Sequence, residues 1–227
     1  MNSISIKSIG IIMDGNRRWA KEQGLPSLEG HRRGLDKVKD LVSWVQEAGI
    51  KELILYAFST ENWNRSPEEV NYLMNLFEMT FGKDVDDIVK KGARVKFIGQ
   101  RERLPVSLQK KMDEVEVRTK EGTKGTLIIA LSYGGRAEIL RGVNTLLAQK
   151  VEQVDEASFR QALWGGEFSD PDLIIRTGGD KRLSNFLTWQ SVYSELFFTD
   201  TKWPAFEKAE FDSILAEYSL REQRRGV

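Results

Sequence analysis

The sequence has 227 residues, of which 40% are hydrophobic and 30% charged, an ordinary composition for a globular protein with a sizeable core. Its 34 basic and 34 acidic residues give a formal net charge of +0, which argues against nucleic-acid binding through bulk positive charge. The sequence contains no cysteine and a single histidine, His31, which excludes disulfides, cysteine nucleophiles and multi-histidine metal sites within one chain.

The apolar runs are too short to enter a membrane as spans. Residues 127–131 are apolar, whereas a spanning helix needs roughly 18 such residues. The apolar stretch at 9–13 is too short for a signal peptide and leads directly into Asp14. We therefore expect a cytoplasmic protein. Without an internal repeat or a linker-like segment, we expect one domain over residues 1–227.

Apolar runs and apolar periodicities alternate along the chain. Short apolar runs predict strands at 8–13, 52–58, 94–98, 126–131, 173–175 and 196–198. Apolar residues at helical spacing predict a helix that ends near Gly49, followed by helices at 67–91, 104–121, 139–147, 155–164 and 207–222. Ser66, Pro67 and Glu69 have the spacing of a capping box at the start of the helix 67–91.

Alternating strands and helices predict an α/β fold with a mostly parallel six-stranded sheet flanked by helices. Ligands of such sheets bind outside the carboxyl ends of the strands. The segments expected there are 14–19, 59–65, 132–136 and 176–185. They bring arginines, glycine pairs, hydroxyls and amides to one rim, with few carboxylates.

These residue types suit a phosphate ester with magnesium. Arginine forks and glycine-rich turns at helix starts hold phosphate oxygens. Mg²⁺ takes one or two carboxylates and completes its shell with water and substrate phosphates, so the lone Asp14 fits it. The rim therefore predicts a site for a diphosphate ester and Mg²⁺.

Each feature alone has a plainer interpretation. Asp14-Gly15 is also typical of a simple turn, and arginine runs are more often a solvated face. His31 suits a hydrogen-bonded structural role equally well, and Trp19 and Trp63 suit packing better than stacking on a ligand. The convergence of the candidates on one rim favours a functional site.

At these residues the sequence resembles the cis-prenyltransferases, over nearly the whole chain. The segments that carry the resemblance are Ile12-Met13-Asp14-Gly15-Asn16, Arg18-Trp19-Ala20, Gly30-His31, Tyr56-Ala57-Phe58-Ser59-Thr60-Glu61-Asn62-Trp63, Tyr133-Gly134-Gly135-Arg136, Ile175-Arg176-Thr177-Gly178-Gly179, Arg182-Leu183-Ser184-Asn185-Phe186 and Tyr193-Ser194-Glu195-Leu196-Phe197. Several long motifs in the right order make the resemblance specific.

The resemblance implies a homodimeric transferase. Such enzymes extend an allylic diphosphate, commonly farnesyl diphosphate, by cis addition of isopentenyl diphosphate, and their product serves as a lipid carrier in cell-wall or glycan synthesis. The resemblance further implies an apolar tunnel for the growing chain, and peripheral membrane contact when the product leaves. The apolar face of the helix 67–91 is the candidate tunnel wall, and plain core packing is its alternative role.

The resemblance also assigns roles to residues. Asp14 is expected to bind magnesium and to be catalytic with Asn62, and Glu195 is expected as a second metal ligand. The residues expected to bind substrate are Gly15, Asn16, Arg17, Arg18, Trp19, His31, Ser59, Thr60, Glu61, Trp63, Arg65, Arg176, Arg182, Ser184, Arg224 and Gly226. Arg224 and Gly226 match an Arg-x-Gly motif that reaches into the partner subunit.

Two positions depart from the pattern of many bacterial members, which have glycine where Arg17 stands and arginine where Ser27 stands. Arg17 is a candidate replacement for the charge absent at Ser27. The base that takes the proton from the isopentenyl unit stays open between Asp14, a hydroxyl–amide relay and a diphosphate oxygen.

Three other functions fit less well. A trans-type prenyl synthase would need paired Asp-Asp-x-x-Asp motifs and an all-helical pattern. A non-catalytic partner subunit would be expected to lack the carboxylate of Asp14. A phosphate-ester hydrolase or nucleotide-binding module would need a P-loop or a Rossmann glycine pattern, and the sequence has neither.

Overall fold

A computed structural model describes residues 6–83 and 85–221. These residues form a six-stranded sheet in the order β3-β4-β2-β1-β5-β6, and every pairing in it is parallel. The predicted α/β sheet is therefore confirmed, and "mostly parallel" becomes wholly parallel in the described residues. The strands are β1 (Ser8–Ile12), β2 (Glu52–Ser59), β3 (Arg94–Ile98), β4 (Thr126–Tyr133), β5 (Leu173–Arg176) and β6 (Glu195–Phe198).

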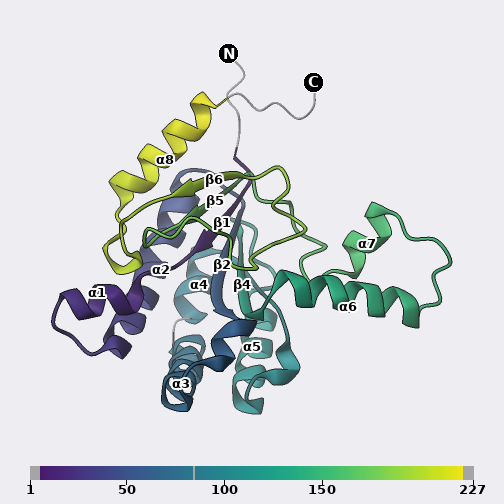
Figure 1. Cartoon of the computed structure of the whole chain (residues 1–227), viewed down its shortest axis with the longest axis horizontal. Helices are drawn as coiled ribbons and strands as arrows, with labels where there is room; N and C mark the ends of the chain where they lie inside the picture. The colour runs from purple at the N-terminus through teal and green to yellow at the C-terminus, as the bar shows by residue number, and fades with distance from the viewer. Residues whose placement is uncertain (1–5, 84, 222–227) are drawn as a thin grey trace.

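Helices connect the strands, with α6 and α7 projecting on one side and α8 lying near β6 (Figure 1). The helices are α1 (Asn16–Glu22), α2 (Ser27–Glu47), α3 (Pro67–Lys83), α4 (Val85–Lys91), α5 (Val106–Thr119), α6 (Gly135–Ala148), α7 (Glu156–Ala162) and α8 (Lys208–Leu220). Three short 3₁₀ helices are η1 (Thr60–Asn64), η2 (Arg101–Arg103) and η3 (Trp203–Ala205). None of the helices described here combines the length and the apolar character that crossing a membrane requires.

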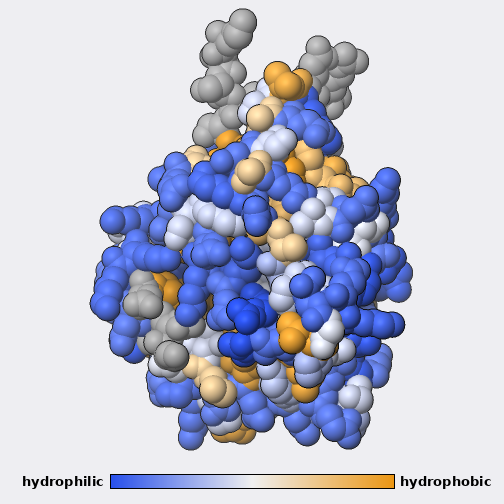
Figure 2. Space-filling view, turned by 90° about the vertical axis from the view of Figure 1, so that its left-hand side faces the viewer, coloured by the Kyte–Doolittle hydropathy of each residue, from blue (hydrophilic) through white to orange (hydrophobic). Residues whose placement is uncertain are grey.

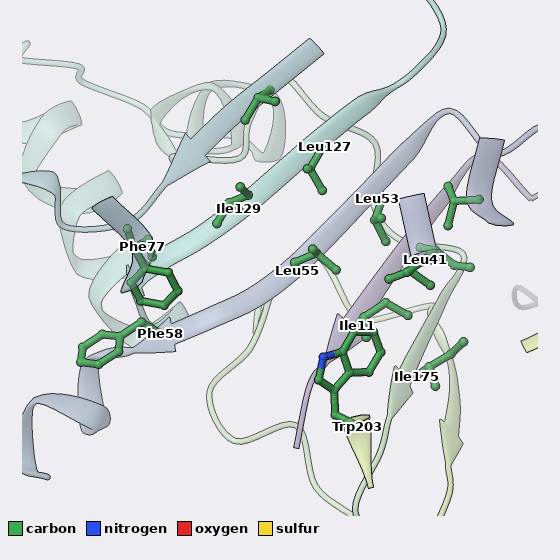
Figure 3. Packing of buried hydrophobic residues seen from close by; sticks show 14 of the residues in the cluster. Ile11, Leu41, Leu53, Leu55, Phe58, Phe77, Leu127, Ile129, Ile175 and Trp203 are labelled. Carbon is green, nitrogen blue, oxygen red and sulfur yellow. The ribbon is translucent and has the colours of Figure 1, made fainter. Parts of the chain in front are cut away.

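The strand residues alternate between two apolar clusters, because successive side chains point to opposite faces of a sheet. Ile11, Leu55 and Ile129 pack into the larger cluster together with Leu41 of α2 and Phe77 of α3 (Figure 3). The neighbouring residues Ile12, Ile54, Ile128 and Ile174 pack into a second cluster on the other face. Burial of both faces explains why these strands are continuous apolar runs in the sequence.

Two helical expectations need correction. The single helix expected at 67–91 consists of α3 and α4, separated by residue 84, which is not described. The apolar spacing still continues across both, because Phe81 and Ile88 pack into the same cluster. The helix α1 was not expected, since its seven residues offer little apolar periodicity. Gly49 ends the α2 segment with a φ of 76°, as expected of a glycine after a helix.

The side of the molecule that carries α1 and α8 presents a mainly hydrophilic surface with small apolar patches (Figure 2). The apolar side chains of the chain are thus mostly used inside, between the sheet and its helices.

Candidate active site

The carboxyl ends of the parallel strands form one rim, because Ile12, Tyr56 and Arg176 lie in register on neighbouring strands. A cavity of about 830 Å³ opens there. Ten predicted site residues line it: Asp14, Asn16, His31, Ser59, Glu61, Asn62, Arg65, Arg176, Arg182 and Ser184. Within the described part of the chain, the predicted residues outside its wall are Gly15, Arg17, Arg18, Trp19, Thr60, Trp63 and Glu195.

Asp14 follows β1 directly and is held by basic groups. Its Oδ2 accepts a hydrogen bond from Arg176 Nη2 at 2.8 Å, and its Oδ1 lies 3.1 Å from Arg18 Nη2. Gly15 N–H donates to Oδ1 at 2.6 Å. Burial alone would raise the pKa of Asp14, but the hydrogen bonds from Arg176 and Gly15 and the two positive charges outweigh it and lower the pKa. The carboxylate is therefore ionised at neutral pH.

Gly15 is required by the backbone at this turn. Its φ is 97°, and an added Cβ would lie 2.9 Å from the Lys202 side chain. The residue forms the N-cap of α1 and directs the helix start towards the rim. A glycine here therefore lets Arg18, one turn into α1, reach Asp14.

Arg176 is the most buried charge in the site, with a side chain 4% exposed. Its Nη1 donates to Ser184 Oγ at 2.7 Å and to the Arg182 carbonyl at 2.5 Å. Ser184 has a φ of 50°, so the loop after β5 adopts an uncommon backbone conformation at the point where it contacts Arg176. The predicted residues Arg176, Arg182 and Ser184 are thus brought together.

Asp180 is a site residue that the sequence did not single out. Its Oδ1 accepts from Arg182 Nη1 at 2.9 Å, and its Oδ2 accepts from Arg18 Nη2 at 3.3 Å. The Arg18 guanidinium also donates to the Gly178 carbonyl at 2.6 Å. Asp180 thereby links α1 to the loop after β5. Its position directly after a Gly-Gly pair at the rim was the available signal.

The segment after β2 is capped by two of the predicted residues. Ser59 Oγ accepts from Asn62 N–H at 3.2 Å, while Asn62 Oδ1 accepts from Ser59 N–H at 3.1 Å. This reciprocal box starts η1 and orients the Asn62 side chain at the cavity wall. Asn62 therefore has a structural task in addition to the catalytic role expected of it.

The other predicted residues of η1 make contacts around the cavity. Glu61 Oε1 accepts from Asn185 Nδ2 at 2.9 Å, which joins η1 to the loop after β5. The Trp63 indole N–H donates to Ser132 Oγ at 2.9 Å, and its ring packs edge-on against Phe58. Trp63 is used for packing here, which was the plainer of its two interpretations. Thr60 lies close to Gly134, where an added Cβ would meet its Oγ1 at 2.5 Å.

Another carboxylate, that of Glu69, contacts three of the predicted residues. Its oxygens lie 3.1 Å from Arg17 Nη1, 2.9 Å from Arg65 Nη1 and 3.2 Å from His31 Nε2. The sequence assigned Glu69 to a capping box, and its backbone N–H does donate to Ser66 Oγ at 3.3 Å. Its carboxylate, however, faces the three basic side chains, so the capping box expected at this helix is incomplete.

His31 is largely buried beside this carboxylate. Burial and the charge of Arg65 lower its pKa, and the Glu69 hydrogen bond only partly opposes them. The imidazole is therefore neutral at pH 7, and it lines the cavity as a hydrogen-bonding group.

Asn16 is fixed by close packing of α1 against α2. Its Nδ2 donates to the Met13 carbonyl at 2.9 Å, and its Oδ1 would lie 2.1 Å from a Cβ added to Gly34. Gly30 is equally constrained, since an added Cβ would lie 2.1 Å from the Asn16 carbonyl oxygen. The two glycines therefore allow α2 to bring His31 to the rim. Trp19, on the same α1, is half-buried outside the cavity wall.

Glu195 lies at the opposite end of the strands. It pairs with Leu173 at the start of β5, whereas Arg176, which holds Asp14, pairs with Phe198 at the other end. Its Oε2 accepts from Arg221 Nη1 at 2.7 Å. The predicted metal ligands Asp14 and Glu195 are therefore not brought together within one chain. Arg224 and Gly226 lie outside the described residues.

A magnesium ion fits the donor set only in part. Over residues 6–83 and 85–221, no group of three or more histidine, aspartate or glutamate side chains could hold a metal. Of the two carboxylates in the cavity wall, Asp14 pairs with Arg176, and Glu61 accepts a hydrogen bond from Asn185. The Asp14 carboxylate suits Mg²⁺ that takes most of its ligands from substrate phosphates and water, the usual arrangement for this ion.

Apolar space lies next to the polar cavity. A small pocket of about 70 Å³ shares His31 and Asn16 with it and extends to Leu35, Val38 and Phe77. A larger apolar cavity of about 340 Å³ follows, lined by Leu35, Val38 and Phe81 among others. Polar and apolar spaces thus lie in series between α2 and α3.

Comparison with known proteins identifies relatives over the full length of the chain. The family model described as "Putative undecaprenyl diphosphate synthase" matches residues 12–226. An isoprenyl transferase of Thermotoga maritima is 48% identical over 223 residues, covering 96% of this chain and 95% of that protein. A ditrans,polycis-undecaprenyl-diphosphate synthase, (2E,6E)-farnesyl-diphosphate specific, of Legionella pneumophila is 42% identical and covers 100% of this chain and 98% of its own.

Two solved structures share the fold, each with 100% of both chains covered. One is lavandulyl diphosphate synthase from Lavandula x intermedia in complex with dimethylallyl diphosphate, with a TM-score of 0.95 and 33% identity. The other is a probable undecaprenyl diphosphate synthase from Campylobacter jejuni, with a TM-score of 0.84 and 32% identity. Both similarities extend from the sheet to the rim described above.

Proposed function

The chain belongs to the undecaprenyl diphosphate synthase family and is a prenyltransferase, and from that premise we propose that it condenses isopentenyl diphosphate onto an allylic diphosphate such as farnesyl diphosphate, in cis. One observation carries the proposal: the ionised Asp14 and the buried Arg176 lie 2.8 Å apart in the wall of a polar cavity that adjoins apolar space. The polar part suits two diphosphates, and the apolar part suits a prenyl chain.

Different residues would bind the two diphosphates of the reaction. Negative charge grows on the departing diphosphate as the allylic C–O bond weakens, and Arg18 with nearby backbone N–H groups would stabilise it. Arg176, Arg182 and Ser184 would hold the second diphosphate, so that the reacting carbons meet in one orientation. The proton of the isopentenyl unit then leaves to a base that is not assigned.

We propose Mg²⁺ as the cofactor, with Asp14 as its protein ligand. When bound, the ion supplies neutralisation of diphosphate charge during departure. Support comes from the exposure of the Asp14 carboxylate, 30% of its side chain, at a cavity wall that also contains arginines. Glu195 would serve the same ion only at the site of a second copy, because it lies at the other end of the strands.

We propose a homodimer for two reasons. The first is that Glu195 lies away from the Asp14 site of its own chain, and the second is an exposed apolar stripe on α6. Leu140, Val143 and Leu147 are 64%, 41% and 68% exposed and follow one another along one face of α6. An apolar stripe of this kind suits contact with another protein surface. In the dimer, Glu195 and the Arg-x-Gly motif at Arg224 and Gly226 would act at the partner's site.

The apolar cavity between α2 and α3 is proposed as the tunnel for the growing chain. Its lining by Phe81, Val38 and Val42 matches the chemistry of an isoprenoid chain. The product would be a polyprenyl diphosphate that serves as lipid carrier for cell-wall or glycan synthesis. We place the enzyme in the cytoplasm, with peripheral membrane contact when this apolar product leaves.

The experiment that tests the proposal is direct. The protein is incubated with Mg²⁺, radiolabelled isopentenyl diphosphate and farnesyl diphosphate, and the product is analysed for chain length and double-bond geometry. Elongated products whose new double bonds are cis support the proposal. Absence of product, or new double bonds that are trans, contradicts it.

A further inference from the structure

The Glu69 carboxylate pairs with three basic side chains on one side of the cavity. It contacts Arg17 from α1, His31 from α2 and Arg65 from the segment before α3, all within 3.2 Å. The Glu69 side chain is only 13% exposed, whereas the Arg17 and Arg65 side chains are 55% and 29% exposed. One largely buried carboxylate thus pairs with two arginines whose side chains are themselves partly exposed.

The charges around Glu69 do not balance. Two guanidinium groups face a single carboxylate, and the neutral His31 adds a donor but no charge. His31 and Arg65 line the cavity together with Asp14. A phosphate group has more acceptor oxygens and more charge than a carboxylate, so it forms stronger pairs with the same arginines.

We infer that Glu69 is an internal substitute for substrate phosphate, which holds Arg17, His31 and Arg65 in place until the allylic diphosphate displaces it. The inference rests on the proposed function and adds a residue to it. Glu69 is a positioning residue in this scheme, because it acts through the three basic side chains. Pairing with Glu69 keeps these side chains in place when the site is empty. The diphosphate must compete with Glu69 for them, and this competition weakens diphosphate binding.

The competition predicts that removing the charge of Glu69 tightens binding. Glu69→Gln keeps the size of the side chain but gives up its charge-assisted pairs. Glu68→Gln is the matched control, because Glu68 is exposed on the same first turn of α3 and loses the same charge. Calorimetry measures binding of farnesyl diphosphate alone and of isopentenyl diphosphate alone, so no reaction occurs.

We expect Glu69→Gln to bind farnesyl diphosphate about tenfold tighter than the wild type, with isopentenyl diphosphate changed less than about twofold and Glu68→Gln within about twofold for both. Weaker or unchanged binding of farnesyl diphosphate by Glu69→Gln overturns the inference, because a purely structural Glu69 would organise the arginines for the ligand. A wild type that binds neither diphosphate overturns the proposed function as well, which separates the two failures.

A structure of the wild type with farnesyl diphosphate tests the same point without a variant. The Glu69 carboxylate should then have left Arg17 and Arg65, and their guanidinium groups should contact phosphate oxygens. Arginines that still pair with Glu69 in the complex overturn the inference, whether or not Glu69→Gln folds.

Discussion

Arg176 Nη2 lies 2.8 Å from Asp14 Oδ2, although 162 residues separate the two in the chain. The contact exists because β1 and β5 are neighbours in the sheet, with Ile12 in register with Arg176. It provides a buried guanidinium with a counter-charge at the cavity wall. The Asp14 carboxylate thus serves both the arrangement of the site and, in the proposed function, the chemistry.

Asp14→Ala is expected to fold but to lose turnover by roughly 10²-fold or more, because the carboxylate acts on the charge that develops during the reaction. Steady-state kinetics at saturating Mg²⁺ measures this, with a thermal melt to confirm folding. Asp14→Asn keeps an acceptor for Arg176 but not the charge, so it should lose activity similarly. Near-normal activity of either variant would show that Asp14 is not the metal carboxylate.

Asn62 offers a separation of structure from chemistry, because its Oδ1 caps η1 through Ser59 N–H. Asn62→Asp retains that acceptor and loses the amide donor, whereas Asn62→Ala loses both. If the amide N–H₂ group assists the reaction, both variants should lose kcat by roughly 10²-fold, the usual size of such a contribution. Activity that survives in Asn62→Asp and falls in Asn62→Ala would assign Asn62 to the cap alone.

The sequence predicted the sheet well and the charge pairs poorly, for different physical reasons. Strands covered on both faces, such as β1, β4 and β5, are mostly apolar runs and could be located from the sequence. The edge strand β3 alternates Arg94 and Lys96 with apolar residues, and it too was predicted at its observed bounds, Arg94–Ile98. The rim followed from the rule for parallel sheets. Ion pairs such as Arg17–Glu69, 52 residues apart, depend on how helices pack and leave no local pattern.

Two further results show the limits of local signals. Glu69 was assigned to a capping box, and its contacts with Arg17 of α1 and His31 of α2 were not predicted. Glu195 was assigned to the metal by resemblance alone, whereas its place at the start of β6 puts it at the amino end of the sheet. The strand rule, applied to Glu195, already indicated that separation within one chain.

A substitution of Phe81 tests whether the apolar cavity is the tunnel for the growing chain. Phe81 packs in the main core and lines the 340 Å³ apolar cavity, so Phe81→Ala should lengthen that cavity. We expect longer products and a loss of about 3–5 kcal/mol in the free energy of unfolding. Leu108→Ala is the control, since Leu108 is fully buried in the same cluster without being among the residues of that cavity's wall. Unchanged product length in Phe81→Ala would leave Phe81 with packing only.

His31 should make stability depend on pH, because its pKa in the folded protein lies below its ordinary value of 6.5. At a pH well above 6.5 it is neutral in both states and makes little contribution. As the pH falls through 6.5, the unfolded chain binds the proton first, so stability is lost until the pH reaches the folded pKa. Urea unfolding at pH 7.5 and 5.5 should therefore show a larger loss for the wild type than for His31→Gln. Equal losses would contradict the expected shift.

The last prediction concerns the exchange of residues between subunits. Arg224 and Gly226 match a motif expected at the partner's diphosphate site, and the alternative is a dispensable tail. Deleting residues 224–227 should leave folding and dimerisation intact, raise the KM for isopentenyl diphosphate and lower kcat.

Mixing this deletion variant with Asp14→Ala should restore part of the activity, because one site in a mixed dimer then combines an intact Asp14 with an intact tail. Glu195→Gln mixed with Asp14→Ala is the parallel case, since Glu195 lies away from Asp14 in its own chain. Exchange of subunits is verified by mixing differently tagged copies. If subunits exchange and neither mixture regains activity, the tail and Glu195 do not act across the dimer. The prediction that one subunit completes the active site of the other is then wrong.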